Sequence, residues 1–355
     1  MNKSYFRKEI LRASGYFLPD PGSTVKLDQN ELPYDIPEPI KDEILGRLKS
    51  IEWNRYPRFS NPALRKRLGL VLGWSPDGIV VANGSNVLIQ AVIIASSLGK
   101  PIITVKPTFG LYRSEAELFG SKVIEVSFDG GFKFPLEKIL KAIKSYKPRL
   151  SIFANPNAQT GTLADEDELI QVVKKASGLV VIDEAYFEFS GTSLLPRLKK
   201  YPNLILLRTF SKAFGLGGVR IGYLIAAPGI AENVQKAVLP FCLNSLSEAI
   251  ALSMLDHLDL VSKRAGEIAQ ERDQLYSKMK EIEGVSVVPS SANFLLFKVK
   301  GQSSKSVYKN LVSQGYSVRD VSDRDQLRQC LRVSVGSPEH NRGFLEALAN
   351  LAKIQ

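Results

Sequence analysis

Seven short apolar segments alternate with helical patterns across most of the first two thirds of this 355-residue chain, and this alternation restricts the possible folds most strongly. Uninterrupted apolar strands are typical of parallel sheets that are buried on both faces. A regular order of strand and helix predicts such a sheet, covered by helices. We therefore expect an α/β fold with a largely parallel sheet. The expected strands lie near Ile79, Ile102, Val123, Leu150, Val180, Ile205 and Ile221.

The last third of the chain has a different pattern. A long helical periodicity over residues 247–283 precedes four strand candidates, GVSVVP, ANFLLFKV, YSVRDV and CLRVSVG. This order predicts a smaller α+β domain. We expect a large domain over residues 37–237, and a linking helix with the small domain over residues 238–355. Residues 1–36 are expected to pack with the small domain or over the mouth of the ligand site.

The segment LLRTFSKAFGLGGVRIGY, residues 206–223, brings a lysine, hydroxyl groups and an arginine to the end of an expected strand. The amine of Lys212 can form a Schiff base with an aldehyde. The hydroxyls of Thr209 and Ser211 and the guanidinium of Arg220 can hold a phosphate. The segment suits a covalently bound, phosphorylated cofactor. Taken alone, it fits an ordinary glycine-rich turn about equally well.

A second segment, GLVVIDEAYFEF, places Asp183 at the carboxyl end of a buried strand. Ligands of open parallel sheets bind at these strand ends. In pyridoxal phosphate enzymes a carboxylate can keep the pyridine nitrogen protonated, so that the ring accepts electrons. Asp183 is the candidate for that carboxylate, and Tyr186 is within reach of the phenolic oxygen. Either residue alone also fits a helix cap or a packed ring.

Two further turns follow expected strands. Gly84, Ser85 and Asn86 precede an apolar helix, where free backbone N–H groups and the helix dipole favour an anion. Such a turn is more often only a helix cap. Phe109, in KPTFGLY, can stack on a pyridine ring, and ordinary core packing is the equal alternative.

Together these segments resemble the histidinol-phosphate aminotransferase family, within the fold type I pyridoxal phosphate-dependent aminotransferases. The resemblance covers nearly the whole chain, and TFSKAFGLGGVRIGY is its most specific motif. The other matching motifs are ASGYFLP, KLDQNELPYDIP, NRYPRFSNPALRKRLG, PTFGLY, VIDEAYFEF and CLRVSVGSPEHN.

The resemblance implies a role for each matching residue. Lys212 would form the Schiff base, Asp183 would face the pyridine nitrogen and Tyr186 would contact the phenolic oxygen of pyridoxal 5′-phosphate. Phe109 would stack on the ring. The implied phosphate ligands are Ser85, Asn86, Ser211, Arg220 and, from a second subunit, Tyr56.

On the substrate side, the resemblance implies that Arg332 binds a carboxylate and that Arg319 lies near the distal anionic group. Tyr16 and Asn30 would also face the substrate. Because Tyr56 would cross to the partner's phosphate, the resemblance implies a homodimer with shared active sites.

The chain departs from the family pattern in two places. The family usually has an asparagine before the proline of an NPTG-like segment, where it contacts the phenolic oxygen. Here ANPNAQTG has Ala158 and Gln159 at those positions, and Asn157, one residue earlier, is the candidate for the contact. Asn86 and Val87 stand where acidic residues are common. We expect that change to be tolerated because the implied phosphate contacts are backbone N–H groups.

Composition argues against a nucleic-acid-binding, disulfide-rich, metal-binding or membrane protein. The formal charge of +11 comes from Lys and Arg that are interspersed with Asp and Glu, which does not favour nucleic acid as a partner. Cys242 and Cys330 are too few for a disulfide framework, and with His257 and His340 they form no metal-ligand pattern. We expect no metal. The start of the chain has no secretory pattern and no apolar run reaches membrane-spanning length, so we expect a cytoplasmic protein.

The expected reaction is amino-group transfer from L-histidinol phosphate to 2-oxoglutarate, giving imidazole acetol phosphate and L-glutamate in histidine biosynthesis. Its partners are a small amino donor and a 2-oxo acid acceptor. The alternatives are a broad aromatic amino acid aminotransferase and a threonine-phosphate decarboxylase of the same fold. A non-catalytic binder of the cofactor is a further alternative, against which Lys212, Asp183, Tyr186 and Arg220 argue together.

Overall fold

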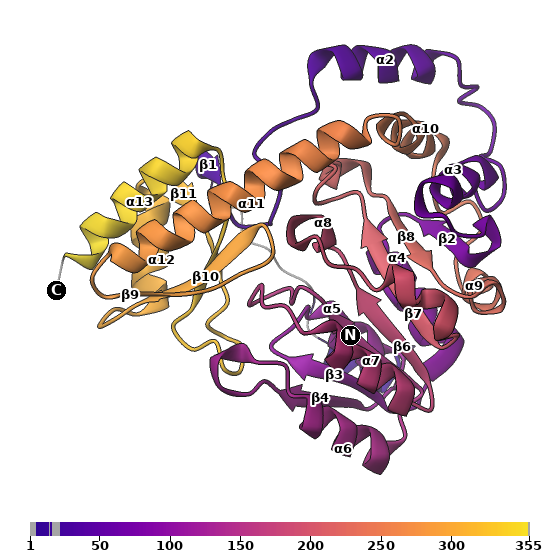
Figure 1. Ribbon diagram of the computed structural model, residues 1–355, viewed down its shortest axis with the longest axis horizontal. Coiled ribbons are helices and arrows are strands. Elements are labelled where there is room, and N and C mark those ends of the chain that lie inside the picture. Colours follow the sequence, from indigo (N-terminus) through magenta and orange to yellow (C-terminus); the bar gives the residue numbers. More distant parts are fainter. Residues whose placement is uncertain (1–4, 14, 16–21, 354–355) are drawn as a thin grey trace.

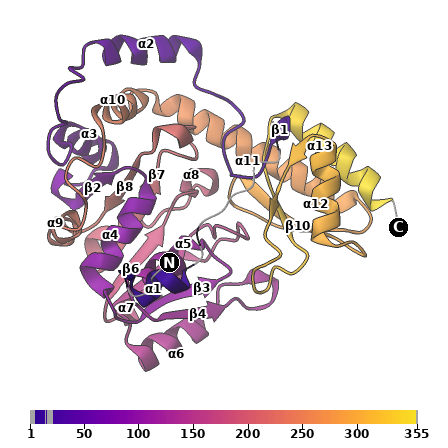
Figure 2. The ribbon, with the colours of Figure 1, turned by 180° about the vertical axis from the view of Figure 1, so that it is seen from behind.

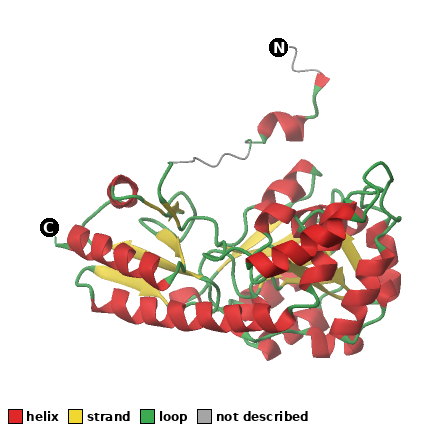
Figure 3. Cartoon of the chain, turned by 90° about the horizontal axis from the view of Figure 1, so that it is seen from above, coloured by secondary structure: helices red, strands yellow, loops and turns green. Residues whose placement is uncertain are grey.

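The structure is a computed structural model that describes residues 5–13, 15 and 22–353 (Figure 1). It has a larger sheet with helices on both faces and, beside it, a smaller sheet with its own helices (Figure 3). Among the described residues, no helix combines the length and the apolar character needed to cross a membrane. The expected α/β class is confirmed.

The larger sheet has seven strands in the order β2-β8-β7-β6-β5-β3-β4. β8 runs antiparallel to both of its neighbours, and the other pairs are parallel. All seven expected strands are present, and all of them except the edge strand β4 consist mostly of buried apolar residues. Their bounds are β2 Ile79–Ala82, β3 Ile102–Lys106, β4 Val123–Ser127, β5 Leu150–Ala154, β6 Leu179–Asp183, β7 Leu204–Thr209 and β8 Gly222–Ile225.

Helices cover both faces of this sheet. Because crossovers between parallel strands are right-handed, connections that run in opposite directions along the sheet put their helices on opposite faces. α4 therefore shares a face with α5, and α6 shares the other with α7, and each pair is in contact. The helices of this part are α2 Glu38–Lys49, α3 Pro62–Leu72, α4 Ser85–Ser97, α5 Leu111–Leu118, α6 Leu136–Tyr146, α7 Glu166–Lys175, α8 Phe187–Ser190 and α9 Pro228–Gln235. A short helix, α1 Lys8–Arg12, precedes them.

The smaller sheet is antiparallel, with the order β12-β13-β10-β9. Its strands are β9 Val285–Val288, β10 Phe294–Val299, β12 Arg319–Asp320 and β13 Leu331–Ser334. The segment YSVRDV, expected to be one strand, forms two short ones. β11 Tyr316–Ser317 pairs in parallel with β1 Val25–Lys26, whereas β12 pairs with β13, because the chain changes partners at Val318.

The helical stretch over residues 247–283 was expected to be continuous, and this is wrong. It consists of α10 Ser245–Met254 and α11 Leu258–Glu281, separated by a turn. Asp256 in that turn accepts hydrogen bonds from Arg47 and Arg67, which lie on α2 and α3. We call the larger sheet with its helices the large body and the smaller sheet with its helices the smaller body. The turn is thus anchored to the large body, where α10 lies beside α2 (Figure 2). The remaining helices are α12 Ser304–Ser313 and α13 Pro338–Ala352.

α11 connects the two hydrophobic cores. Its first half contributes Val261, Ala265 and Ile268 to the larger core, and its second half contributes Leu275 and Met279 to the smaller one. The division into domains at residues 237 and 238 stays a prediction. The structure adds that α10 packs with the larger core and that the smaller core includes Leu27 from the amino-terminal part.

Candidate active site

Most of the expected cofactor residues meet at one edge of the large sheet, where the parallel strands have their carboxyl ends. Ser85 follows β2, Phe109 follows β3 and Asn157 follows β5. Asp183 is the last residue of β6, and Lys212 lies just beyond β7. Parallel strands place their carboxyl ends together, so residues far apart in sequence share one site.

Asp183 is buried, with both carboxylate oxygens hydrogen-bonded. Oδ2 accepts from the hydroxyl of Tyr112 at 2.6 Å, and Oδ1 accepts from the backbone N–H of Ala185 at 3.1 Å. Burial raises the pKa of Asp183 from 3.8 to about 6, while the Tyr112 and Ala185 hydrogen bonds act against that rise. The carboxylate is therefore oriented and remains largely ionised near neutral pH.

Lys212 is partly buried, and its Nζ donates to the backbone oxygen of Gln29 at 2.9 Å. Desolvation, the largest cause, together with the positive charges of Arg332 and Arg220, lowers the pKa of the amine from 10.5 to about 7. Nζ lies 5.8 Å from the centre of the Tyr186 ring. A substantial fraction of this amine is neutral at neutral pH, as a nucleophile or base requires.

The turn after β2 and the loop after β7 come together around Arg220. Arg220 donates to Ser211 Oγ at 3.2 Å and to the oxygen of Gly217 at 3.0 Å. A Cβ added at Gly84 would lie 2.7 Å from Arg220 Nη2, and one added at Gly222 would collide with the backbone of Ser85. Both glycines thus allow the N-terminus of α4 to approach Arg220.

Asn86 is exposed at the first turn of α4, next to Ser85, which is partly buried. The helix has no side-chain cap at its N-terminus. Its first backbone N–H groups, beside the guanidinium of Arg220, form an arrangement that can hold an anion.

The two substrate-side arginines lie side by side. Arg319 on β12 and Arg332 on β13 are directly paired, so their side chains leave the same face of the sheet. Arg332 donates to the oxygens of Ala158 and Asp28, at 2.9 and 3.2 Å, and lies 5.0 Å from the centre of the Phe294 ring. Its Nε is buried and has no hydrogen-bond partner among the described residues.

Residues 27–30 cross the site, and all four of their carbonyl oxygens accept hydrogen bonds. They accept, in order, from Ser334 N, Arg332 Nη2, Lys212 Nζ and Asn293 Nδ2. The distances are 2.8, 3.2, 2.9 and 3.0 Å. One segment of the amino-terminal part therefore contacts groups from both bodies.

Asn30 and Tyr186 are hydrogen-bonded to each other. Nδ2 of Asn30 donates to the hydroxyl of Tyr186 at 2.9 Å, and both side chains are buried. The ring of Tyr186 packs edge-on against Phe294, with centroids 5.4 Å apart. Asn30, expected on the substrate side, thus touches a residue expected on the cofactor side.

Asn157 is buried in the loop after β5 and is engaged locally. Its Oδ1 accepts from Gln159 N and Thr160 N, and its Nδ2 donates to the oxygen of Pro107 at 3.1 Å. An amide nitrogen carries two N–H groups, so one donor is left for a cofactor. Its contact with the phenolic oxygen stays a prediction.

Among the described residues, Tyr56 is not part of this cluster. Tyr16 lies outside the described residues. Tyr56 is 83% exposed, and its ring contacts Phe241 with centroids 5.0 Å apart. Phe59 contacts the other side of Phe241, at 6.1 Å. Within one chain Tyr56 therefore belongs to an exposed aromatic group and not to the group of residues around Arg220.

A buried charged cluster lies behind the strand of Asp183. Glu184 accepts from Arg208 Nε and from Ser193 Oγ, both at 2.9 Å. The guanidinium of Arg208 lies 3.7 Å from the centre of the Phe187 ring. Oε2 of Glu188 is buried and has no hydrogen-bond partner within the described part of the chain, and burial raises the pKa of Glu188 from 4.5 to about 8.

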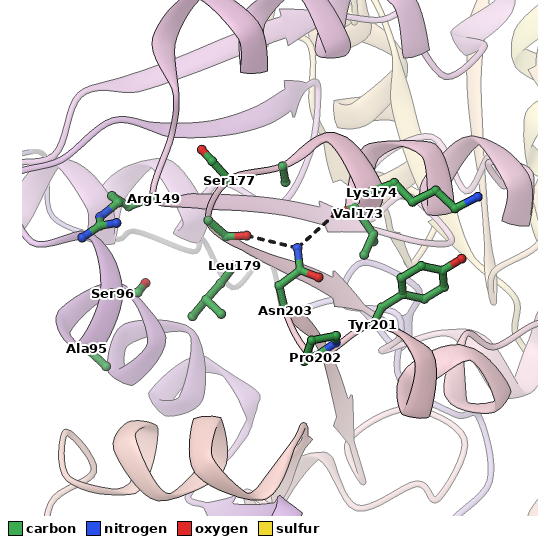
Figure 4. Close-up of a pocket in the computed structure, with 12 residues that line it drawn as sticks. Ala95, Ser96, Arg149, Val173, Lys174, Ser177, Leu179, Tyr201, Pro202 and Asn203 are labelled. Atoms are coloured by element: carbon green, nitrogen blue, oxygen red, sulfur yellow. Dashed lines mark hydrogen bonds between the residues drawn. The ribbon is translucent and has the colours of Figure 1, made fainter.

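A further cavity lies elsewhere. It measures about 670 Å³ and lies at the amino ends of β5, β6 and β7, opposite the candidate site (Figure 4). Asn203 spans its floor by donating to the oxygens of Val173 and Gly178, at 3.1 and 3.3 Å. None of the expected site residues lines it. A second cavity, of about 400 Å³, lies between residues 26–35 and the loop that carries Ser211.

Sequence reasoning missed Tyr112, Asp28, Gln29 and Asn293. Tyr112 follows Phe109 by three residues at a helix start, a spacing that places both on one side, so its proximity was predictable. Gln29 acts through a backbone oxygen, which no side-chain pattern reveals. Asn293 donates to the Asn30 carbonyl only because two segments distant in sequence meet.

Comparison with known proteins identifies the family. Residues 23–348 match the family model described as "Aminotransferase class I and II". The chain is 35% identical over 352 residues to a histidinol-phosphate aminotransferase of Caldanaerobacter subterraneus subsp. tengcongensis, covering 99% of each chain. It is 38% identical over 342 residues to one of Pyrococcus furiosus, covering 96% of each. The solved structure of the Sinorhizobium meliloti histidinol-phosphate aminotransferase in complex with pyridoxal-5′-phosphate superposes with a TM-score of 0.87, at 23% identity, covering 99% of this chain and 98% of that one. The chain therefore belongs to the class I and II aminotransferase family.

Proposed function

We propose that this chain is a pyridoxal 5′-phosphate-dependent aminotransferase that converts L-histidinol phosphate and 2-oxoglutarate to imidazole acetol phosphate and L-glutamate. The observation that carries the proposal is a partly buried Lys212 amine of lowered pKa at the same sheet edge as an oriented Asp183 carboxylate. Relatives of full length that carry the histidinol-phosphate aminotransferase name support the choice of substrate.

The residues at the sheet edge fit the cofactor. Gly84 and Gly222 have no side chain, which lets the start of α4 lie close to Arg220, so that backbone N–H groups and the guanidinium can face one phosphate. When bound, pyridoxal phosphate supplies an aldehyde that takes up amino groups and a ring that accepts electrons. Ser85, Ser211 and Arg220 would hold its phosphate, Asp183 would face its ring nitrogen, and Phe109 would pack on its ring.

Lys212 would serve both as the covalent attachment point and as the base. A neutral amine can remove the proton from the α-carbon of the amino donor, and a pKa of about 7 supplies that form at neutral pH. Tyr186, held by Asn30, would orient the phenolic side of the cofactor.

Arg332 and Arg319 would bind the anionic ends of the substrates. Histidinol phosphate carries a phosphate and no carboxylate, whereas glutamate carries two carboxylates, so one site must accept both anions. The planar fork of arginine pairs with either group. Arg332 is also held in place by two backbone oxygens, and its buried Nε is a further donor.

The same proposal includes a homodimer in the cytoplasm. Trp53, Tyr56 and Phe59 are 74, 83 and 60% exposed, and Leu239 beside Phe241 is 74% exposed. Tyr56 and Phe59 both contact Phe241, and exposed apolar side chains grouped in this way mark an interaction surface. A second copy covering them would bring its Tyr56 to the phosphate site. Both cysteines, Cys242 and Cys330, are free, in agreement with a reducing compartment. Sedimentation at micromolar concentration would give a dimer, and a fully active monomer would contradict it.

The decisive experiment compares three substrates. Amino-group transfer from histidinol phosphate, with 2-oxoglutarate as acceptor, should far exceed transfer from phenylalanine, and phosphothreonine should not be decarboxylated. Preference for phenylalanine would identify an aromatic aminotransferase, and carbon dioxide from phosphothreonine would identify a decarboxylase. Lys212→Ala should abolish all three activities, since each of them would require the amine of Lys212 as the attachment point of the cofactor.

A further inference from the structure

Tyr112 lies in the first turn of α5 and contacts Asp183 directly. No function has yet been assigned to it. It is 1% exposed, and its hydroxyl donates to Asp183 Oδ2 at 2.6 Å. Its ring packs edge-on against Phe109, with centroids 5.6 Å apart and an interplanar angle of 87°. One short segment after β3 therefore supplies both the ring expected to stack on the cofactor and a direct contact with Asp183.

The hydrogen bond has a fixed direction and a fixed geometry. An ionised carboxylate only accepts, so the phenol must donate, and burial beside Asp183 raises the pKa of Tyr112 well above its usual value. The N–H of Ala185 occupies the other oxygen, Oδ1. With one donor on each oxygen, the plane of the carboxylate cannot rotate freely.

The charge on Asp183 depends on a small number of groups. Burial favours the neutral acid, and the negative charge of Glu184, the next residue in the chain, acts in the same direction. The hydrogen bonds from Tyr112 and Ala185 and the charge of Lys212 favour the carboxylate. Tyr186 also faces Asp183 and stays neutral, because burial raises the pKa of its phenol. Tyr112 makes the larger of the two hydrogen-bond contributions.

We propose that Tyr112 is a positioning residue that keeps Asp183 ionised and oriented, so that the proton shared with the cofactor resides on the pyridine nitrogen. This inference rests on the role of Asp183 in the proposed function. A carboxylate that already accepts a hydrogen bond is a weaker base. Without the phenol, Asp183 would draw the proton from the nitrogen onto itself, and the ring would become a poorer electron acceptor.

The direct test is nitrogen-15 NMR of the protein loaded with pyridoxal phosphate labelled at the ring nitrogen. The unsubstituted protein should give the resonance of a protonated pyridine. Tyr112→Phe removes only the hydroxyl and should move the resonance toward the neutral pyridine value. Tyr223→Phe is the matched control, since Tyr223 is equally buried in the same body but has its hydroxyl on Arg208.

The pH dependence of cofactor affinity gives a second measurement. Affinity should fall as the pH falls through the pKa of Asp183 in the cofactor-free protein, which lies at about 6. Tyr112→Phe raises that pKa, so its affinity should begin to fall at higher pH. Well below pH 6 the variant should bind roughly tenfold more weakly for each unit of pKa change, and the two proteins should converge at alkaline pH. Tyr223→Phe should follow the unsubstituted protein.

A second variant keeps the test decisive if Tyr112→Phe does not fold. 3-Fluorotyrosine at position 112 retains the shape and the hydroxyl and makes the phenol a stronger donor. It should keep the nitrogen protonated and shift the fall in affinity to lower pH. A protonated nitrogen in every variant, with unchanged pH dependence, would overturn the inference while leaving the proposed function intact. A neutral nitrogen in the unsubstituted protein would overturn the role of Asp183 and this inference together.

Discussion

The lowered basicity of Lys212 leads to the most informative prediction. Burial, the largest cause, and neighbouring positive charges lower the pKa of this amine from 10.5 to about 7. At pH 8 an amine with a pKa of 7 is about 90% neutral, whereas one with a pKa of 10.5 is about 0.3% neutral. In the cofactor-free protein, the neutral form of Lys212 should therefore be about 300-fold more abundant than for an unperturbed lysine.

Competitive labelling with trace acetic anhydride measures this for each lysine separately. Only the neutral amine reacts, so the acetylation rate of Lys212, read by mass spectrometry, should rise with pH and level off above pH 8. Lys305, exposed on α12, serves as the reference within the same molecule. A Lys212 profile parallel to that of Lys305 up to pH 10 would refute the argument.

Two substitutions separate the causes. Arg332 is the largest electrostatic cause of the lowered pKa of Lys212. Arg332→Met should raise that pKa and leave it below 10.5, because desolvation remains. Arg319→Met removes the neighbouring charge on the same sheet face, which is not a cause of the shift, and should leave the Lys212 profile unchanged. Equal effects from both variants would contradict the assignment.

Three further predictions concern the surroundings of the site. Burial raises the pKa of Glu188 to about 8, so the folded state holds its proton more tightly than the unfolded chain and stability is lost as the pH rises from 4.5 through 8. Glu188→Gln should therefore stabilise the protein by about 2–4 kcal/mol at pH 9 and by little at pH 4.5, in thermal unfolding scans. Arg208→Leu leaves the Glu184 carboxylate buried and unpaired, so it should lower the free energy of unfolding, measured in urea, by about 3–5 kcal/mol. Adding Glu184→Leu should restore a part of that loss. Gly84→Ala puts a Cβ against Arg220 at a φ of +82°, so cofactor affinity should fall roughly tenfold in a fluorescence titration, whereas Gly229→Ala, with open space around it, should bind normally.

The strands of the large sheet could be predicted because each carries its own local signal. Val180 and Ile205, for example, lie in uninterrupted apolar runs, as expected where helices cover both faces. The position of Asp183 at the end of such a run then predicts its place at the ligand edge. Fold and main site residues thus follow from short-range patterns together with one topological rule.

The remaining features depend on contacts that no local pattern encodes. The break between α10 and α11 is stabilised by Asp256 bonding to arginines on two earlier helices. YSVRDV forms two strands because its first half pairs with β1, at residues 25–26, and its second half pairs with β13. Asn30 bonds to Tyr186 across 156 positions of sequence. Each of these arises from tertiary packing, which overrides the local preference.

The parallel pairing of β1 with β11 makes the smaller body discontinuous in sequence. Its core takes Leu27 from near the start of the chain, and the carbonyl of Leu27 receives the N–H of Ser334. A fragment that starts at residue 238 would lack this strand and leave the edge of β11 unpaired, a site for non-native association. Expressing the carboxyl-terminal part alone should therefore give an aggregation-prone product, and adding back a peptide of residues 22–36 should restore its solubility. Recombination could not exchange this body as one contiguous gene segment.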